Sequence, residues 1–558
     1  MRLPRSLHVA LVALALLCSV PAAFASAYNG RPKLVVVIVI DQFRGDYLER
    51  YRDQFGEGGF RLFLDHGAYF TDCNYDYANT RTAPGHATLF TGSYTSGHGI
   101  IANEWWDPQK KKRVTSVEDE TTRLVGVDRA GPGASSHNLM SDTLGDELKL
   151  ATGGKARVFA VSLKDRAAVL PAGFSGDAAY WIDPQNGAWI TSTYYRPDLP
   201  EWVRNFNGRR PGEGRAEKYW NREWKDSDGN TLGSTAPRNG KNKDSAPAGF
   251  YEVVGSTPFA NDYQFEFAKE LVLYEKLGAG SATDLLVISL SANDILGHQV
   301  GPDSPQMRGM ALELDRSLAE FFGFLGHQIG MANVWMALSA DHGVAPLPDF
   351  AKTLRLPAAN LDTKSLREQI NSLLSKKYAK KGDYVLDLDY PMAWLNEEAF
   401  AGTPAGRKES DAEADTGEAM KQVGLAGYFT KSQLARGETP ATEIGRRYAH
   451  SYSLEGGWYV IGIPAPFQVG VKTGTDHASP FSYDTHVPLA FYGLAFQPGI
   501  YRTHAEPVDL AVTLASLLGI NAPAQATGRV LTEALQPPHH STAPPATLPA
   551  TPPPGGTQ

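Results

Sequence analysis

The sequence predicts an α/β fold in which a central, mainly parallel β-sheet is sandwiched by helices, with cap or insert regions added to it. The first observation is a set of short apolar runs without polar alternation, which is typical of strands buried on both faces. These runs cover residues 34–40, 158–163, 284–291 and 334–340. The second observation is helical periodicity between them, because apolar residues recur at three-to-four-residue spacing over 265–276 and 310–324.

Each of the four predicted strands ends at charged residues. Asp41 follows the first run and Lys164 the second, whereas Asp294 and Asp341 follow the third and the fourth. In open α/β sheets the ligand crevice lies beyond the carboxyl ends of the strands. We therefore expect these side chains to belong to one functional site.

The rest of the chain is organised around this core. We expect one catalytic domain over residues 30–535, with insertions at about 178–260 and 350–450. The first of these stretches has little periodicity and reads as long loops or a small cap. The second contains a predicted helix at 363–377 and a possible strand at 384–388.

The N-terminus has the pattern of a secretory signal peptide. Arg2 and Arg5 precede a mostly apolar run over residues 7–20, and small-residue cleavage motifs end at positions 25 and 27. We predict a signal peptide over 1–25, with cleavage near 25 or 27. The protein is then exported to a bacterial periplasm or secreted.

Composition excludes several classes of protein. With 42% hydrophobic and 20% charged residues the chain is not mostly disordered, and after the signal peptide no apolar run is long enough to span a membrane. The net charge is −8 and no stretch concentrates Lys and Arg, so nucleic-acid binding is not expected.

Loss of Cys18 with the signal peptide leaves Cys73 alone, which excludes an intrachain disulfide. Residues 537–558 are predicted to be a disordered Pro-rich tail, and His539 and His540 are expected to be solvated within it.

Six residues combine carboxylate and imidazole groups, the ligand types that suit Zn²⁺ where no thiolate is available. They are Asp41, Asp294, His298, Asp341, His342 and His486. Asp294 and His298 stand four residues apart, so one helical turn or a tight loop can aim both at one ion. Taken singly, each residue could be a hydrogen-bonded core or surface residue. The set as a whole favours a metal centre.

The segment T-R-T-A-P-G-H-A-T-L-F-T-G, residues 80–92, predicts the start of a helix. Pro84 is favoured in a first helical turn, which places Thr82 just before the helix, at its positive end. A Thr alkoxide is stabilised there by the helix dipole and by any metal ion that it contacts. Local sequence alone favours the other interpretation, in which Thr82 is an N-cap without chemistry. His86 and His98, in and just after this segment, are expected to have packing or supporting roles.

Together these motifs resemble the alkaline phosphatase superfamily. They are Asp41 after an apolar strand, T-x-T-A-P-G-H-A-T, T-G-x-x-x-x-x-H-G-I-x-x-N, D-x-x-x-H, S-x-D-H-G and a late T-H-V-P. The resemblance spans roughly residues 33 to 530. The sulfatase branch is disfavoured, because its C-x-P-S-R or S-x-P-S-R string is missing and Cys73 lies outside any such string.

Two branches of this superfamily use a Thr nucleophile between two Zn²⁺ ions: the nucleotide pyrophosphatases/phosphodiesterases and the secreted alkaline phosphatases of PafA type. Lys164 and Arg166, in S-L-K-D-R-A-A, resemble the Lys and Arg with which the second branch contacts phosphate. Asn103 matches a phosphate-binding Asn of both branches. A phosphoryl group from a monoester carries more negative charge than one from a diester, so two added cations suit a monoesterase. From the residues alone, Lys164 and Arg166 could instead lie on a solvated loop.

The resemblance implies a zinc-dependent phosphomonoesterase with two Zn²⁺ per chain, Thr82 as nucleophile and a phosphothreonine intermediate. It implies one ion bound by Asp294, His298 and His486, and another bound by Asp41, Asp341, His342 and the Thr82 oxygen. We expect small-molecule phosphate monoesters as substrates and a monomeric protein.

Two alternatives stay open at this point. One is a phosphodiesterase or nucleotide pyrophosphatase that uses the same Thr82 and metals, and the other is a non-catalytic metal or glycan binder. Three further residues have two interpretations each. His477 is either a partner of a metal ligand or a loop residue, and Trp105 and Trp106 form either a pocket wall or a packed pair.

Overall fold

The protein is described here by a computed structural model. It describes residues 30–208, 218–219, 221–235, 253–404, 408–454 and 457–536. The predicted signal peptide and Pro-rich tail, with His539 and His540, lie outside the described residues.

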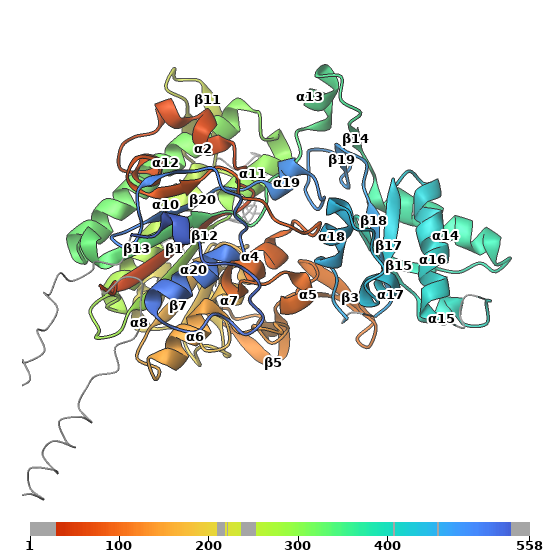
Figure 1. Ribbon diagram of the computed structural model, residues 1–558, viewed down its shortest axis with the longest axis horizontal. Helices are drawn as coiled ribbons and strands as arrows, with labels where there is room; N and C mark the ends of the chain where they lie inside the picture. Colours follow the sequence, from red (N-terminus) through yellow and green to blue (C-terminus); the bar gives the residue numbers. More distant parts are fainter. Residues whose placement is uncertain are drawn as a thin grey trace, which may run out of the picture.

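The centre of the fold is a sheet of eleven strands in the order β21-β2-β20-β13-β1-β12-β7-β8-β9-β5-β6 (Figure 1). From β13 through β1, β12 and β7 to β8 neighbouring strands are parallel, whereas β20 and β9 run antiparallel at the two sides. The predicted α/β fold is confirmed, and the sheet is mixed, with a parallel centre. Its strands are β1 Leu34–Ile40, β2 Ala68–Phe70, β5 Glu118–Val125, β6 Pro132–Ala134, β7 Val158–Ser162, β8 Ala178–Ile182, β9 Trp189–Ser192, β12 Asp284–Leu290, β13 Val334–Ser339, β20 Leu489–Tyr492 and β21 Gly499–Tyr501.

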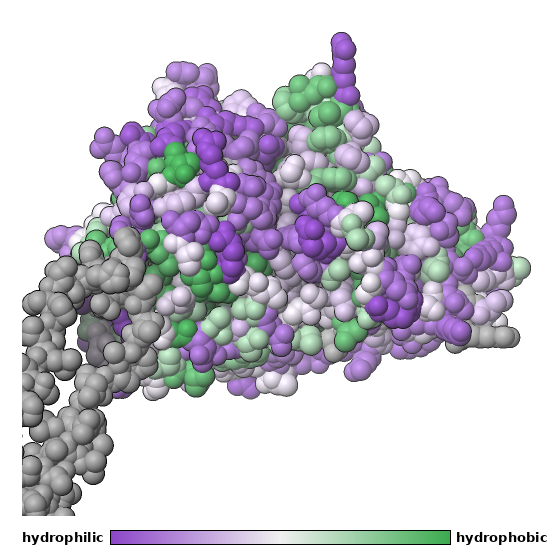
Figure 2. Space-filling model, viewed as in Figure 1, coloured by the Kyte–Doolittle hydropathy of each residue, from purple (hydrophilic) through white to green (hydrophobic). Residues whose placement is uncertain are grey.

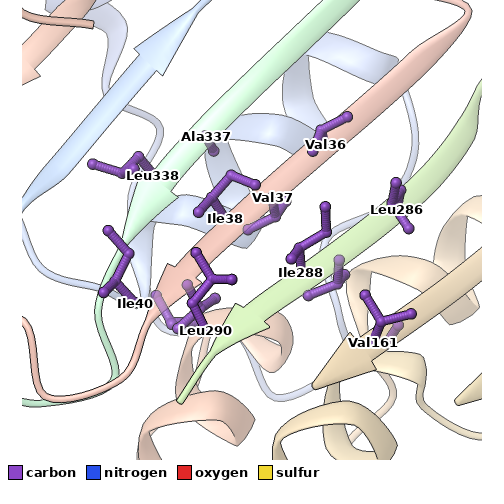
Figure 3. Close-up of a cluster of buried hydrophobic side chains, with 14 of the residues drawn as sticks. Val36, Val37, Ile38, Ile40, Val161, Leu286, Ile288, Leu290, Ala337 and Leu338 are labelled. Atoms are coloured by element: carbon purple, nitrogen blue, oxygen red, sulfur yellow. The ribbon is translucent and has the colours of Figure 1, made fainter. Parts of the chain in front are cut away.

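The apolar runs form the parallel centre because both faces of these strands are covered. All seven residues of β1 are fully buried, and β7, β12 and β13 are buried along their whole length. Figure 3 shows their side chains packed between neighbouring strands, for example Ile38 beside Ile288 and Leu338. Burying one such side chain contributes ~1.5–3 kcal/mol, so the runs drive the formation of this core.

Two groups of helices pack against the sheet. In the first group α7 contacts β7, β8 and β12 and packs on α4 and α6, and α20 packs on α4 and α6. In the second group α10 contacts β7 and β12 and packs on α8, α11 and α12, while α3 contacts β2, β20 and β21. The helix predicted at 310–324 lies within α12, and the one predicted at 265–276 overlaps α10, which ends two residues earlier. The bounds are α3 Phe60–His66, α4 Thr82–Thr91, α6 Leu144–Ala151, α7 Asp165–Ala172, α8 Glu201–Asn207, α10 Pro258–Tyr274, α11 Ala292–Val300, α12 Pro305–Gln328 and α20 Asp509–Leu518.

A second, four-stranded sheet lies at the right of Figure 1 and has its own hydrophobic core. Its order is β15-β16-β18-β17, and α14 and α16 pack against it. This unit contains most of the stretch expected as the insertion at 350–450. The helix predicted at 363–377 is α14. The bounds are β15 Val385–Asp389, β16 Met392–Leu395, β17 Gly427–Thr430, β18 Tyr459–Ile463, α14 Thr363–Lys377 and α16 Glu409–Gln422.

The stretch expected as the first insertion, 178–260, does not begin as an insertion. Its first strands, β8 and β9, pair within the large sheet. The strands β8 and β9 are therefore part of the core, because both are buried along their whole length.

The remaining elements are short. They are α2 Tyr47–Arg50, α5 Thr95–His98, β3 Glu104–Asp107, β4 Lys112–Thr115, β10 Glu223–Lys225, β11 Thr231–Ser234, α13 Pro348–Thr353, β14 Ala359–Asn360, α15 Glu397–Phe400, α17 Lys431–Ala435, α18 Glu443–Ala449, β19 Gln468–Val469, α19 Ser482–Thr485, and the 3₁₀ helices Arg52–Gln54, Met331–Asn333 and Thr532–Ala534. Hydrophilic residues cover most of the face in Figure 2, with hydrophobic residues gathered at α13, where Phe350 and Leu354 are exposed. Cys73 is buried and unpaired. Within the described part of the chain, no helix has the length and apolar character needed to cross a membrane.

Candidate active site and metal centre

Four neighbouring strands deliver charged residues to one edge of the large sheet. In the order β13, β1, β12 and β7, these strands are followed by Asp341, Asp41, Asp294 and Lys164. The strands are parallel and in step, since Val39 near the end of β1 is paired with both Ser289 and Ser339. Their carboxyl ends therefore lie side by side, at the place where open α/β sheets bind ligands.

Asp41, Asp341 and His342 form the first candidate metal group. Each offers one ligand atom, and these atoms lie within 4.8 Å of one another. Nε2 of His342 is 3.4 Å from Oδ1 of Asp41 and 3.7 Å from Oδ2 of Asp341, and all three side chains are fully buried. None of these three atoms has a hydrogen-bond partner among the described residues. Buried polar atoms that face one another without partners fit a cation between them.

The charges of the first group also fit a cation. Burial raises the pKa of Asp41 well above its ordinary value, and the nearby carboxylates of Asp294 and Asp341 add to this effect. Burial lowers the pKa of His342, which favours the neutral imidazole that binds metal ions. A divalent cation would therefore stabilise a site that otherwise crowds carboxylates together.

Asp294, His298 and His477 form the second candidate group. Asp294 and His298 lie one turn apart on α11, and Oδ1 of Asp294 is 3.1 Å from Nε2 of His298 and 3.9 Å from Nε2 of His477. Nδ1 of His298 lies 2.8 Å from the carbonyl of Thr475, and Nδ1 of His477 lies 2.6 Å from the carbonyl of Thr80. A carbonyl oxygen can only accept, so each ring donates from Nδ1 and turns its Nε2 toward Asp294. Burial works to lower the pKa of His298, but the Asp294 carboxylate outweighs it and raises this pKa to about 10, so Nε2 of His298 also carries a proton, whose place a metal ion would take.

The prediction that His486 belongs to this group is wrong. Nε2 of His486 lies 3.0 Å from the carbonyl oxygen of Thr71. Its ring fills the space beside Gly45, where an added Cβ would lie 2.7 Å from the ring. His477 occupies the place in its stead, with its ring stacked on His342 at 3.8 Å between centroids. The sequence pattern does not mark His477 as a metal ligand, because it lies in a loop, away from any predicted strand end.

Thr82 is the first residue of α4, one position further into the helix than expected. Its hydroxyl oxygen lies 3.4 Å from Nζ of Lys164, and its side chain is buried. The helix can come this close to the sheet because residue 85 is a glycine. A Cβ at Gly85 would lie 2.3 Å from the carbonyl oxygen of Asp341.

His86 and His98 have supporting contacts, as expected for both. Nδ1 of His86 lies 2.8 Å from the Thr82 carbonyl and 3.3 Å from Oδ2 of Asp341. Nε2 of His98 lies 3.1 Å from the Thr88 hydroxyl, and burial lowers the pKa of His98 to about 3. His86 thus touches both the helix start and a candidate ligand, whereas His98 packs behind them.

Lys164 lies between the two groups. Its Nζ is 2.6 Å from Oδ2 of Asp41 and 2.6 Å from Oδ2 of Asp294. Burial works to raise the pKa of Asp294, but Lys164 and His298 outweigh it and hold this pKa well below its ordinary value. The ammonium group is therefore the cation that both candidate groups share in the described structure.

Of the two other expected phosphate contacts, Asn103 lies next to Thr82 and Arg166 shares a cavity with Lys164. Oδ1 of Asn103 accepts a hydrogen bond of 2.8 Å from the N–H of Ala83, next to Thr82. Arg166 is in the first turn of α7, two residues after Lys164, and both line a cavity of about 320 Å³ together with Trp181.

Trp105 and Trp106 lie on β3 and line a different cavity, of about 470 Å³. Their neighbours there include His137 and Met140, and none of the predicted site residues lines it. Both rings also pack against the hydrophobic cluster around Trp394 and Tyr459. Trp105 and Trp106 thus form part of a cavity wall, but this cavity is separate from the predicted site residues.

Comparison with known proteins identifies the family of the chain. The family model for type I phosphodiesterase / nucleotide pyrophosphatase matches residues 35–423. Alkaline phosphatase PhoV from Synechococcus elongatus is 33% identical over 528 residues, covering 91% of this chain and 93% of that protein. Alkaline phosphatase PafA from Elizabethkingia meningoseptica is 33% identical over 526 residues, covering 90% and 95%.

Solved structures extend the comparison to the fold. The crystal structure of wild type alkaline phosphatase PafA matches with a TM-score of 0.81 and 31% identity, over 91% of this chain and 99% of that chain. Murine ectonucleotide pyrophosphatase / phosphodiesterase 5, at 16% identity and a TM-score of 0.52, has the same fold. The chain therefore belongs to the type I phosphodiesterase / nucleotide pyrophosphatase family of the alkaline phosphatase superfamily, and within it the chain is similar to the PafA-type alkaline phosphatases.

Proposed function

We propose that the protein is a zinc-dependent alkaline phosphatase that hydrolyses small phosphate monoesters through a phosphothreonine at Thr82. The observation that carries this proposal is the position of Lys164. Its ammonium group lies 3.4 Å from the Thr82 hydroxyl and touches a carboxylate of each candidate metal group. A nucleophile, a cation for the phosphoryl group and two ligand sets thus meet at one point.

Two ligand sets of three residues support a two-metal site. We assign Asp294, His298 and His477 to one ion, and Asp41, Asp341 and His342 to the other, with the Thr82 oxygen completing the second set. Carboxylate and imidazole ligands without thiolate suit zinc in a catalytic site. When bound, the ions would supply Lewis acidity, favouring the Thr82 alkoxide and neutralising charge on the oxygens that enter and leave.

The chemistry at Thr82 then proceeds in two displacements. Oγ1 of Thr82 forms a bond to phosphorus while the bond from phosphorus to the ester oxygen breaks, and the alcohol leaves. Water next attacks the phosphothreonine, so the bond from phosphorus to Oγ1 breaks and phosphate is released. The position of Thr82 at the first residue of α4 helps, because the positive end of the helix stabilises its developing negative charge.

Lys164, Arg166 and Asn103 are the proposed contacts of the phosphoryl oxygens. Once Asp41 and Asp294 hold metal ions, the Lys164 ammonium can turn from these carboxylates to the substrate. Phosphoryl transfer depends mainly on positioning and charge stabilisation. Lys164 beside Thr82, together with Arg166 in the cavity that Lys164 also lines, would favour a monoester, whose phosphoryl group carries the larger charge.

A phosphodiesterase or nucleotide pyrophosphatase is the second candidate. The observation in its favour is the match of residues 35–423 to the family of those enzymes. Thr82 and both ligand sets would serve that reaction equally. The two candidates differ in the use of Lys164 and Arg166, which a diester requires less.

The deciding experiment compares kcat/KM for p-nitrophenyl phosphate and bis(p-nitrophenyl) phosphate, with zinc content measured on the same protein. We expect a strong preference for the monoester, and loss of that activity in Thr82→Ala. Thr91→Ala is the matched control, because it removes a buried hydroxyl of α4 that donates to the carbonyl of Ala87 and accepts from the N–H of Ser93. A preference for the diester would overturn the proposed substrate class, and full activity of Thr82→Ala would overturn the nucleophile.

We further propose that the enzyme works as a monomer in the periplasm or outside the cell. Support comes from the N-terminal pattern of a signal peptide. Cell fractionation with and without residues 1–25 tests the location, and light scattering of the purified protein tests the oligomeric state.

A further inference from the structure

Gln42 has an unusual backbone directly beside the candidate metal centre. It follows Asp41 at the end of β1, its side chain is buried, and its φ angle is +63°. This left-handed region is uncommon for residues other than glycine and costs free energy. Such a conformation persists only where surrounding contacts hold it, so the contacts of Gln42 are informative.

Those contacts reach one carboxylate in each candidate metal group. The main-chain N–H of Gln42 donates to Oδ1 of Asp341 over 3.1 Å. Its side-chain Nε2 donates to Oδ1 of Asp294 over 2.8 Å. The left-handed turn thus lets a single residue direct its main chain to one group and its side chain to the other.

The structure around Gln42 keeps the turn in place. Nδ2 of Asn293 donates to the main-chain carbonyls of Asp41, over 2.9 Å, and of Gln42, over 3.1 Å. Gly297 leaves room for the amide, because a Cβ there would lie 2.1 Å from Oε1 of Gln42. The turn after β1 and the first turns of α11 therefore pack closely around this amide.

We propose that Gln42 is a positioning residue that orients Asp294 through its side chain and Asp341 through its main chain, and so ties the two metal sites together. The inference rests on the proposed function, since it concerns the same ligand sets. It makes a selective prediction. A substitution removes the side-chain donor to Asp294 but leaves the main-chain donor to Asp341, so only the site of Asp294, His298 and His477 is weakened.

The test measures zinc affinity by chelator competition in two variants that each keep one site. His342→Ala keeps the site of Asp294, and His298→Ala keeps the site of Asp41. Adding Gln42→Met should weaken zinc binding about 10- to 100-fold in the first background, as is usual when the partner of a metal ligand is lost. In the second background the affinity should stay within about twofold, as for independent sites.

Two further variants separate positioning from general destabilisation. Gln42→Asn keeps a residue that tolerates the left-handed backbone, but its amide is one methylene short of Asp294, so it should show the same selective loss. Gln264→Met is the matched control, because Gln264 is a buried glutamine whose Nε2 donates to the carbonyls of Ser289 and Val161 rather than to a carboxylate. It should lower thermal stability without changing zinc affinity in either background.

Equal loss in both backgrounds, or unchanged affinity in the His342→Ala background, would overturn the role of Gln42. If neither single-site variant binds zinc before Gln42 is changed, the metal assignment of the proposed function fails, and the inference fails with it. These results are distinguishable, because the second is already seen with glutamine at position 42.

Discussion

Replacing Lys164 by Met should destabilise the metal-free protein far more than the zinc-loaded protein. Nζ of Lys164 lies 2.6 Å from a carboxylate oxygen of Asp41 and 2.6 Å from one of Asp294, and the three side chains are between 0 and 6% exposed. Without Lys164 these buried carboxylates lose their shared cation. Removing one partner of a buried ion pair costs about 3–5 kcal/mol, because the other charge stays buried without compensation. Protonation of Asp41, whose pKa burial has already raised, relieves part of this cost and favours the lower end of the range.

Zinc should abolish most of this loss of unfolding free energy, because metal ions then neutralise the carboxylates. We expect a loss below about 1 kcal/mol in that state, similar to the loss of an ordinary exposed ion pair. The assay is urea unfolding followed by circular dichroism, in excess chelator and in excess zinc. Lys149→Met is the control: it breaks a part-buried pair with Asp177 of 2.7 Å, and zinc should not alter its small effect. The reasoning is refuted if Lys164→Met costs the same in both states, or costs nothing in the metal-free state.

Two other predictions concern catalysis and pH. Combined Lys164→Ala and Arg166→Ala should lower kcat/KM for p-nitrophenyl phosphate by far more than for bis(p-nitrophenyl) phosphate, and equal losses would contradict their proposed role at the more highly charged phosphoryl group. Burial raises the pKa of Glu413 to about 7, so its proton is held more tightly in the folded state than in the unfolded chain. The associated stability should be complete below pH ~4.5 and decline by up to ~3 kcal/mol as pH rises through 7, in urea unfolding at pH 5 and pH 8. Glu413→Gln should remove this decline, whereas the exposed Glu418→Gln should keep it.

Much of the fold could be predicted because strands and helices that are buried have recognisable patterns of apolar residues in the sequence. The runs at 34–40, 284–291 and 334–340 have no polar alternation, and each became a strand covered on both faces. The helix at 363–377 was recognisable in the same way, from its amphipathic spacing. The antiparallel strands β8 and β9 were missed, because short strands among turns carry a weak pattern and were taken for the beginning of an insertion.

For the site, the sequence by itself determined the residues that follow parallel strands. The carboxyl ends of parallel neighbouring strands lie at the same edge of a sheet. Parallel pairing therefore brings together the residues that follow these strands, which are Asp41, Lys164, Asp294 and Asp341. Only the tertiary structure decided which late histidine joins them. His477 and His486 both lie in irregular segments, where no periodicity relates position in the chain to position in space. His477 joins the site because its ring packs on His342, whereas the ring of His486 packs beside Gly45. Both contacts are between residues far apart in the sequence.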